Sequence, residues 1–356
     1  MDEMNMQAEE LLRRAAQKKA SDIFIVAGRQ ITCKINGEMT VLDEKILMPE
    51  QTEKMVRDIY ILADGRDMEP FQKSGDDDFS FSIPGVSRFR VSTYKQRGSM
   101  AAVIRIIAFE LPDPEALGIP ADILELGNFN RGLVLVTGPA GSGKSTTLAC
   151  IIDYINEHKN NHIITLEDPL EFLHRHKKSI VSQREVSTDT RSYIAALRAA
   201  LRQSPDVILL GEMRDYETIN TVMTAAETGH LIFSTLHTTG ASNTVDRIID
   251  VFPANQQRQI TVQLSSVLQA VVSQQLVPDI NGELIPAFEI MHMTPAVRNM
   301  IRENKVHQID GLIYSSANAQ MISMDSSLLK LYKDGRITRD TALAYATNPE
   351  MLSRKL

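Results

Sequence analysis

The chain has 356 residues, 43% of them hydrophobic, so it is long enough for two globular domains with ordinary cores. Its 45 acidic residues outnumber the 38 Lys and Arg, giving a net charge of -7. This charge excludes bulk electrostatic attraction to nucleic acid or anionic lipid, but it does not exclude a local basic groove. Two distant cysteines argue against a zinc site or a disulfide framework, and the absence of a signal-peptide pattern or a long apolar run favours a cytosolic protein.

The first third of the chain predicts a small α+β domain. Asn36-Gly37 is its strongest hairpin signal, and the strands around Phe79 to Ser92 alternate so that one face is apolar and the other cationic. Arg105 stands in an apolar run and needs a partner if it is buried. The predicted elements are a helix over 4–18, strands over 23–26, 30–34 and 39–42, a helix over 51–60, and strands over 79–83, 89–91 and 101–107.

Three prolines between residues 109 and 120 prevent a continuous helix or central strand, so this segment is predicted to be a linker between domains 1–108 and 121–356. Beyond it, apolar strands alternate with helices, which predicts a parallel, doubly wound α/β sheet. The strand candidates are 133–136, 163–166, 207–210 and 231–233.

From Pro253 onward we expect helices to dominate. Thr294-Pro295 is a good helix start, and Asp325 and Gly335 can bracket another helix. One apolar stripe at helical spacing is formed by Ile260, Leu264, Val267, Leu268, Val271 and Val272.

The stretch from Gly138 to Ser145 matches G-x-x-x-x-G-K-[ST] and lies between a buried-looking strand and an amphipathic helix, the context of a phosphate-binding loop. Glycines let the backbone N–H groups and the helix N-terminus point at phosphate. Lys144 would reach the β and γ phosphates, and Ser145 would offer its hydroxyl to Mg²⁺. The predicted nucleotide-binding residues are Gly138, Gly141, Ser142, Gly143, Lys144, Ser145 and Thr146.

Acidic residues follow two of the predicted strands. Residues 165–172 carry three carboxylates at the carboxyl end of a strand, where doubly wound folds bind ligands, and one of them could orient or deprotonate the attacking water. Glu212 ends the apolar strand 207–210 in the manner of a Walker B acid and would lie near Mg²⁺. Arg214 and Asp215 are predicted to hold the following turn.

His230 and His237 flank a further strand and could contact phosphate. Residues seven apart on a strand point to opposite faces, which argues against joint metal binding.

These motifs resemble those of the PilT retraction ATPases of bacterial type IV pili, a branch of the secretion superfamily ATPases. The resemblance covers both domains. It rests on Gly138 to Thr146 (Walker A), Thr165 to Phe172 (Asp box), Gly211 to Asp215 (Walker B) and Gly229 to His237 (His box). Residues 296–301, Ala-Val-Arg-Asn-Met-Ile, are similar to the retraction motif Ala-Ile-Arg-Asn-Leu-Ile, with conservative changes at positions 297 and 300.

The resemblance implies a homohexamer of subunits with a PAS-like N-terminal domain and a RecA-like ATPase domain that closes on ATP. It implies that Glu171 and Glu212 are the hydrolytic acids and that His230 and His237 sense or stabilise the phosphates. Arginines of the N-terminal domain reach the nucleotide in this family, and the matching positions here are Arg90, Arg97 and Arg105, although the segment from Arg90 to Arg97 is about one residue shorter.

The function implied is a cytoplasmic motor, docked on the platform protein at the inner face of the membrane, that depolymerises pili and drives twitching. The alternatives are a pilus extension or type II secretion ATPase, an accessory retraction ATPase, and a non-hydrolysing nucleotide-binding or nucleic-acid-binding ring. The lack of a four-cysteine motif argues against an extension or secretion ATPase, and the 296–301 motif argues against an accessory retraction ATPase. Lys144 and the two acids argue against a ring that does not hydrolyse nucleotide, and the net negative charge argues against a ring that binds nucleic acid.

Overall fold

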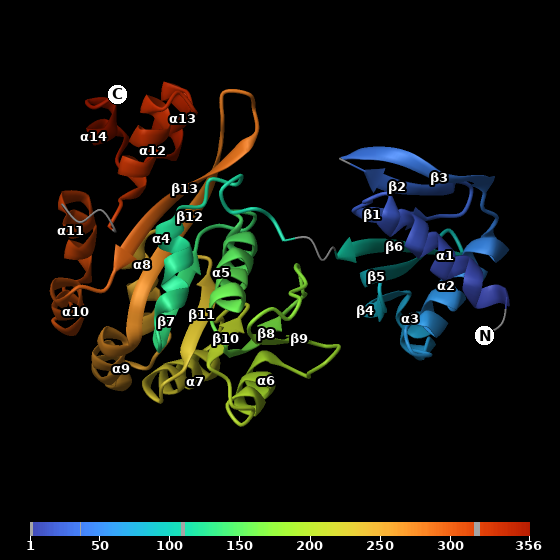
Figure 1. The fold of residues 1–356 in the computed structure, drawn as a ribbon, viewed down its shortest axis with the longest axis horizontal. Coiled ribbons are helices and arrows are strands. Elements are labelled where there is room, and N and C mark those ends of the chain that lie inside the picture. Colours follow the sequence, from blue (N-terminus) through green and yellow to red (C-terminus); the bar gives the residue numbers. More distant parts are fainter. Residues whose placement is uncertain (1–2, 36, 108–110, 317–320) are drawn as a thin grey trace. The chain divides into compact units, whose positions relative to one another are not determined.

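The computed structural model describes residues 3–35, 37–107, 111–316 and 321–356, with the backbone alone given for 3–7. Contacts divide the chain into two compact units, which are described separately below. The first contains Met1–Glu110 and Glu171–Leu173, and the second contains Leu111–Leu170 and His174–Leu356. Figure 1 shows the elements of both units. Among the described residues, no helix is both long and apolar enough to cross a membrane.

The first unit is built on a six-stranded antiparallel sheet in the order β3-β2-β1-β6-β5-β4. Its apolar core is rich in aromatic side chains, including Tyr60, Phe71 and Phe89. Its elements are α1 (Glu3–Gln17), β1 (Asp22–Ile25), β2 (Gln30–Ile35), β3 (Glu38–Ile46), α2 (Pro49–Leu62), α3 (Glu69–Ser74), β4 (Asp76–Ile83), β5 (Ser87–Gln96) and β6 (Ser99–Ile107).

The predicted strands of this unit are confirmed, with longer bounds for most of them. Ile35 pairs with Glu38, as the predicted hairpin requires, and Gly37 has a φ of +84°, although Asn36 itself lies outside the described residues. Arg105 is exposed and pairs with Asp22, so the strand carries this charge without burying it.

The second unit contains a seven-stranded sheet in the order β13-β12-β7-β11-β10-β8-β9. All neighbouring strands are parallel except β12 and β13. The strands are β7 (Gly132–Thr137), β8 (His162–Glu167), β9 (Ile180–Glu185), β10 (Val207–Leu210), β11 (Leu231–Leu236), β12 (Leu268–Pro278) and β13 (Leu284–His292).

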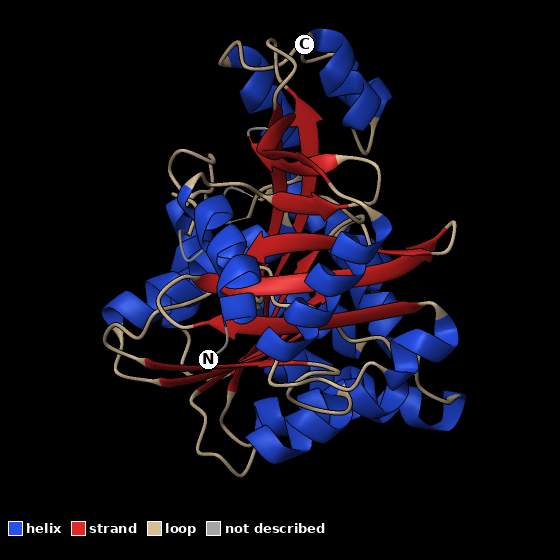
Figure 2. Cartoon of the chain, turned by 90° about the vertical axis from the view of Figure 1, so that its right-hand side faces the viewer, coloured by secondary structure: helices blue, strands red, loops and turns tan. Residues whose placement is uncertain are grey.

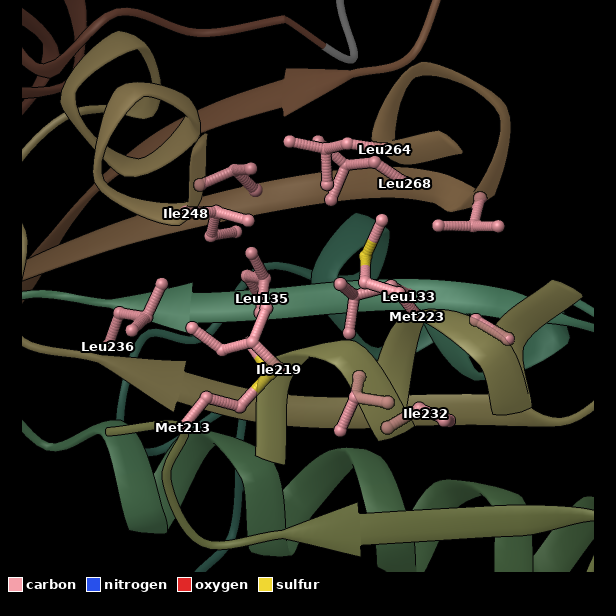
Figure 3. Close-up of a cluster of buried hydrophobic side chains, with 14 of the residues drawn as sticks. Leu133, Leu135, Met213, Ile219, Met223, Ile232, Leu236, Ile248, Leu264 and Leu268 are labelled. Carbon is pink, nitrogen blue, oxygen red and sulfur yellow. The ribbon is translucent and has the colours of Figure 1, made fainter. Parts of the chain in front are cut away.

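Helices cover both faces of this sheet. Figure 2 colours the helices of the chain blue and its strands red. Leu133 and Leu135 of β7 pack with helices α6 to α9, and Figure 3 shows part of this cluster. Val134 and Val136 point to the other face, toward α4 and α5. These helices are α4 (Ala121–Leu124), α5 (Lys144–His158), α6 (Tyr193–Ala200), α7 (Tyr216–Glu227), α8 (Ala241–Asp250) and α9 (Ala254–Val267).

The predicted helical stripe beyond Pro253 is wrong in its second half. Helix α9 ends at Val267, and Leu268, Val271 and Val272 belong to β12, which pairs with β7 on one side and β13 on the other. A short apolar run can be either a buried part of a helix or a central strand covered on both faces. The spacing of its apolar residues does not distinguish the two structures. Strands β9 and β13 were also absent from the prediction.

The chain ends in helices that pack at the β12–β13 edge. Thr294 caps α10 as predicted, because its hydroxyl accepts a hydrogen bond from the N–H of Val297 at 3.3 Å. The predicted helix between residues 325 and 335 is α12. These helices are α10 (Pro295–Arg302), α11 (Ile309–Ser315), α12 (Met324–Lys333), α13 (Arg339–Tyr345) and α14 (Pro349–Ser353).

Candidate active site

The predicted phosphate loop joins the carboxyl end of β7 to the amino end of α5, as the motif requires. Gly138 has a φ of +140°, and a Cβ at this position would collide with the backbone oxygen of Gln274. Gly143 has a φ of +84°, and its Cβ would lie 2.9 Å from the Gln274 side-chain nitrogen. Both glycines are therefore needed for backbone conformation and for close packing against β12.

Polar side chains of the loop surround the position where phosphate is expected. Lys144 is 8% exposed, and its ammonium donates to the carbonyls of Gly138 at 2.9 Å and Pro139 at 2.8 Å. The buried hydroxyl of Ser142 has no hydrogen-bond partner among the described residues. Ser145 and Thr146 follow in the first turn of α5. The loop thus holds a lysine and an unused donor at a helix N-terminus, the arrangement that binds anions.

Gln274 was missed from the sequence because its segment was interpreted as helix. It is 2% exposed on β12, and its side-chain oxygen accepts a hydrogen bond from the Thr147 hydroxyl of α5 at 2.8 Å. With its close approach to both loop glycines, it supports the phosphate loop from the neighbouring strand. The sequence signal that could have found it is a pair of glutamines inside an otherwise apolar run.

Glu212 follows β10 at the same edge of the sheet. Its side chain is 14% exposed and pairs with Arg214 at 2.5 Å, while its second carboxylate oxygen lies 3.5 Å from the Nε2 of His237. The prediction that Arg214 holds the following turn is therefore wrong, because this side chain turns back to the acid. Asp215 does hold the turn, since its carboxylate caps α7 by accepting from the N–H of Thr218 at 2.9 Å.

Tyr193 is a second residue that the sequence analysis missed. Its hydroxyl would lie 2.7 Å from a Cβ at Gly211, which explains why glycine precedes the acid. Burial raises the pKa of the Tyr193 phenol, and the negative charges of Asp168, Glu212 and Glu167 raise it further. The phenol therefore stays protonated beside these three carboxylates.

The two histidines lie at opposite ends of β11. His237 is beside Glu212. His230 precedes Leu231, which pairs with Gly132 at the amino end of β7, whereas the phosphate loop leaves the carboxyl end of that strand. His230 instead lines a cavity of about 300 Å³, and its Nδ1 lies 3.0 Å from the Ala225 carbonyl. Within this chain the structure does not bring His230 to the phosphate loop.

The remaining predicted residues belong to the first unit. Arg90 of β5 pairs in register with Arg105 of β6. Arg97 stands in the turn between these strands with a φ of +48°. Glu171 lies near the end of the Asp box, in the segment 171–173 that is assigned to the first unit. Arg90 and Arg105 thus occupy facing positions on neighbouring strands, and Arg105 also pairs with Asp22 of β1 at 3.1 Å.

The donors at the carboxyl edge of the second sheet fit Mg²⁺. The Ser145 hydroxyl and the Glu212 carboxylate are the hard oxygen ligands that this ion prefers. The Oε2 atom of Glu212 is buried and accepts no hydrogen bond from the described residues, which leaves it able to act as such a ligand.

This constellation is that of a P-loop nucleotide hydrolase. The family model for type II/IV secretion system proteins matches residues 3–289, and the chain belongs to this family. Two relatives refine the placement. The type IV pilus retraction ATPase PilT of Pseudomonas aeruginosa is 45% identical over 345 residues, covering 97% of this chain and 99% of the relative. A twitching motility protein of Neisseria gonorrhoeae is 44% identical over 345 residues, covering 96% and 91%.

A solved structure supports the same placement. A crystal structure of the pilus retraction motor PilT with bound ADP matches with a TM-score of 0.86 and 45% identity, covering 99% of each chain. The predicted fold class, a PAS-like α+β domain followed by a RecA-like α/β domain with C-terminal helices, is confirmed by this match. The predicted resemblance to the PilT ATPases, and with it the predicted class of enzyme, is confirmed as well.

Proposed function

We propose that this chain is the subunit of a homohexameric motor that hydrolyses ATP to power type IV pilus retraction, the depolymerisation of pilin, and hence twitching motility. The observation that carries the proposal is the phosphate loop, which is held by β7, α5 and Gln274 in a chain similar along its whole length to retraction ATPases. Residues 121–356 are the proposed ATPase domain. The ring is proposed to work in the cytoplasm, docked on the platform protein at the inner face of the membrane, and to bind no nucleic acid.

The proposed chemistry transfers the γ-phosphoryl group of ATP to water, giving ADP and phosphate. The backbone of residues 138–146 and Lys144 hold the phosphates, while Glu212 and Glu171 are the hydrolytic acids, one of which accepts the proton of the attacking water. Ser145 and Glu212 would hold Mg²⁺, which supplies positive charge at the phosphate oxygens. His237 lies beside Glu212 and would respond to the γ-phosphate. Because His230 is remote from the loop of its own chain, we assign it no part in this chemistry.

Positive charge for the transition state is proposed to come from Arg90, Arg97 and Arg105 of the first unit. The facing placement of Arg90 and Arg105 supports this role, because it brings two of the three cations together on one face of the sheet. Hydrolysis would then depend on closure of the first unit onto a nucleotide, which is how ATP could drive movement.

The test is deletion of the gene in the source organism and its complementation with the wild-type chain, Lys144→Ala or, as a control, the exposed-site variant Lys178→Ala. We expect deletion and Lys144→Ala to abolish twitching and leave excess surface pili, and Lys178→Ala to restore twitching. The purified wild-type chain should form a hexamer with ATPase activity that Lys144→Ala lacks. Loss of pili on deletion would instead identify an extension ATPase.

A further inference from the structure

A cavity of about 470 Å³ lies inside the first unit, lined by residues of α1, α2, β2 and the end of β3. Its size is in the range of small-molecule sites, which is roughly 300–1,000 Å³. Part of its wall is apolar, with Leu11 from α1, Ile31 from β2, Met55 from α2, and Leu47 between β3 and α2. The cavity contains no residue that the proposed hydrolysis uses.

Asp58 of α2 lines this cavity and is only 7% exposed. Within the described part of the chain its carboxylate makes no hydrogen bond and no ion pair. The one charge found to act on it is that of Lys54, one turn earlier in α2, while burial raises the pKa of Asp58. Burying a carboxylate without a partner is costly, so this position is unfavourable for the empty fold. A donor that enters the cavity would satisfy it.

The other charged residues of the wall indicate the rest of the ligand. Arg14, Lys45 and Lys54 are basic, and Glu10 and Asp43 are acidic, so that with Asp58 the lining has three charges of each sign. Among the described residues, none of the six forms an ion pair. Arg14 uses one donor on the Leu42 carbonyl at 2.9 Å and keeps others available. A cavity with balanced, unpaired charges around an apolar wall is complementary to a ligand that carries both signs.

We propose that this cavity binds a small zwitterion, in which an ammonium group pairs with Asp58 and a short apolar chain leads to an acidic group held by the basic side chains. The end of the site at Asp58 is the more selective one, because this carboxylate is only 7% exposed and has no hydrogen-bond partner among the described residues. The exposed basic side chains contribute less to affinity, since solvent screens them.

Calorimetric titration of the full-length chain tests this proposal, with 5-aminopentanoate as the probe. Pentanoate lacks the amine and pentylamine lacks the acid. We expect saturable binding of 5-aminopentanoate at one site per chain, and binding at least tenfold weaker for each of the two analogues. Asp58→Asn, which keeps the shape of the side chain, should weaken binding of the probe at least tenfold. Glu50→Gln, an exposed acid on the same helix, should leave binding unchanged.

The ATPase rate reports whether the variants are folded, because neither residue belongs to the proposed hydrolytic site, and we expect it to stay at the wild-type value. The proposal is overturned if the probe and its one-carbon-longer homologue both fail to bind. It is also overturned if Asp58→Asn binds the probe as well as wild type does, or if pentanoate or pentylamine binds as tightly as 5-aminopentanoate.

Discussion

The hydroxyl of Thr147 donates a hydrogen bond of 2.8 Å to the side-chain oxygen of Gln274, joining the first turns of α5 to the strand that supports the phosphate loop. Both groups are buried. The bond therefore fixes the start of α5, whose N-terminus faces the phosphate position, against β12. The position of the loop depends on this contact as well as on its glycines.

Thr147→Val should loosen the loop while keeping the shape of the side chain. The substitution leaves the Gln274 oxygen buried without a donor, which costs about 1–3 kcal/mol of the free energy of unfolding. Nucleotide affinity should fall as well, because the loop is less well organised. Urea unfolding and nucleotide titration measure the two effects. Thr221→Val, which removes an exposed hydroxyl bonded within α7, is the control and should change neither. Equal behaviour of the two variants would contradict the assigned role.

Glu212→Gln should slow ATP hydrolysis by several orders of magnitude while leaving ATP binding largely intact, because the amide keeps the shape but loses the charge that acts on water. Glu171→Gln provides the comparison. Single-turnover hydrolysis and nucleotide titration of both variants identify the general base, which we expect to be the acid whose removal slows the chemical step more. Full activity of both variants would remove the two acids from the mechanism.

Arg298 is tied to the end of α9, because its guanidinium donates to the carbonyls of Ser265 at 2.6 Å and Ser266 at 3.1 Å. It thereby satisfies carbonyls at a helix C-terminus, where positive charge is favourable. The motif at 296–301 thus has a structural anchor on α9.

Arg298→Ala should lower the free energy of unfolding by about 1–3 kcal/mol, because charge-assisted hydrogen bonds are lost. If the helix transmits the nucleotide state, twitching should fail while ATP hydrolysis by the purified chain persists. Arg258→Ala, at an exposed position of α9, is the control for both measurements. Normal twitching in a strain whose Arg298→Ala protein is stably folded would show that the helix has only a packing role and does not transmit the nucleotide state.

Much of the fold and of the site could be predicted because the decisive patterns are local. The strand, glycine loop and helix around Lys144 are contiguous in sequence, so spacing alone identifies them. The role of Gln274 depends on which strand lies beside β7, a long-range pairing that periodicity does not encode. The wrong assignment of Leu268 to a helix has the same cause.

Tyr193 and His230 illustrate the two kinds of error that remain. The environment of Tyr193 is created by three carboxylates at the carboxyl ends of β8 and β10, so its own segment carries no signal. His230 carries a strong motif signal, but the direction of β11 separates it from the loop of its own chain. A motif locates a residue along the chain, whereas sheet topology decides which end of a strand lies at the ligand.

His174 should make stability depend on pH below neutrality. This side chain is buried, its Nδ1 has no hydrogen-bond partner among the described residues, and burial lowers its pKa from 6.5 to about 4. Nearby Asp153 raises the pKa and Lys177 lowers it, both by less than burial does. The unfolded chain therefore binds a proton before the folded chain does. Stability from this group is present above pH 6.5 and is lost as the pH falls toward 4.

Between pH 7.5 and 5.5 the loss should be about 1 kcal/mol, from the linkage of one histidine whose pKa is lower in the folded state. Urea unfolding at the two pH values measures it. His174→Gln does not titrate, so its free energy of unfolding should fall by about 1 kcal/mol less than that of the wild type over the same interval. His158→Gln, which changes an exposed histidine of α5, is the control and should keep the wild-type dependence. A His174→Gln curve parallel to that of the wild type would mean that the folded chain protonates His174 as readily as the unfolded chain does.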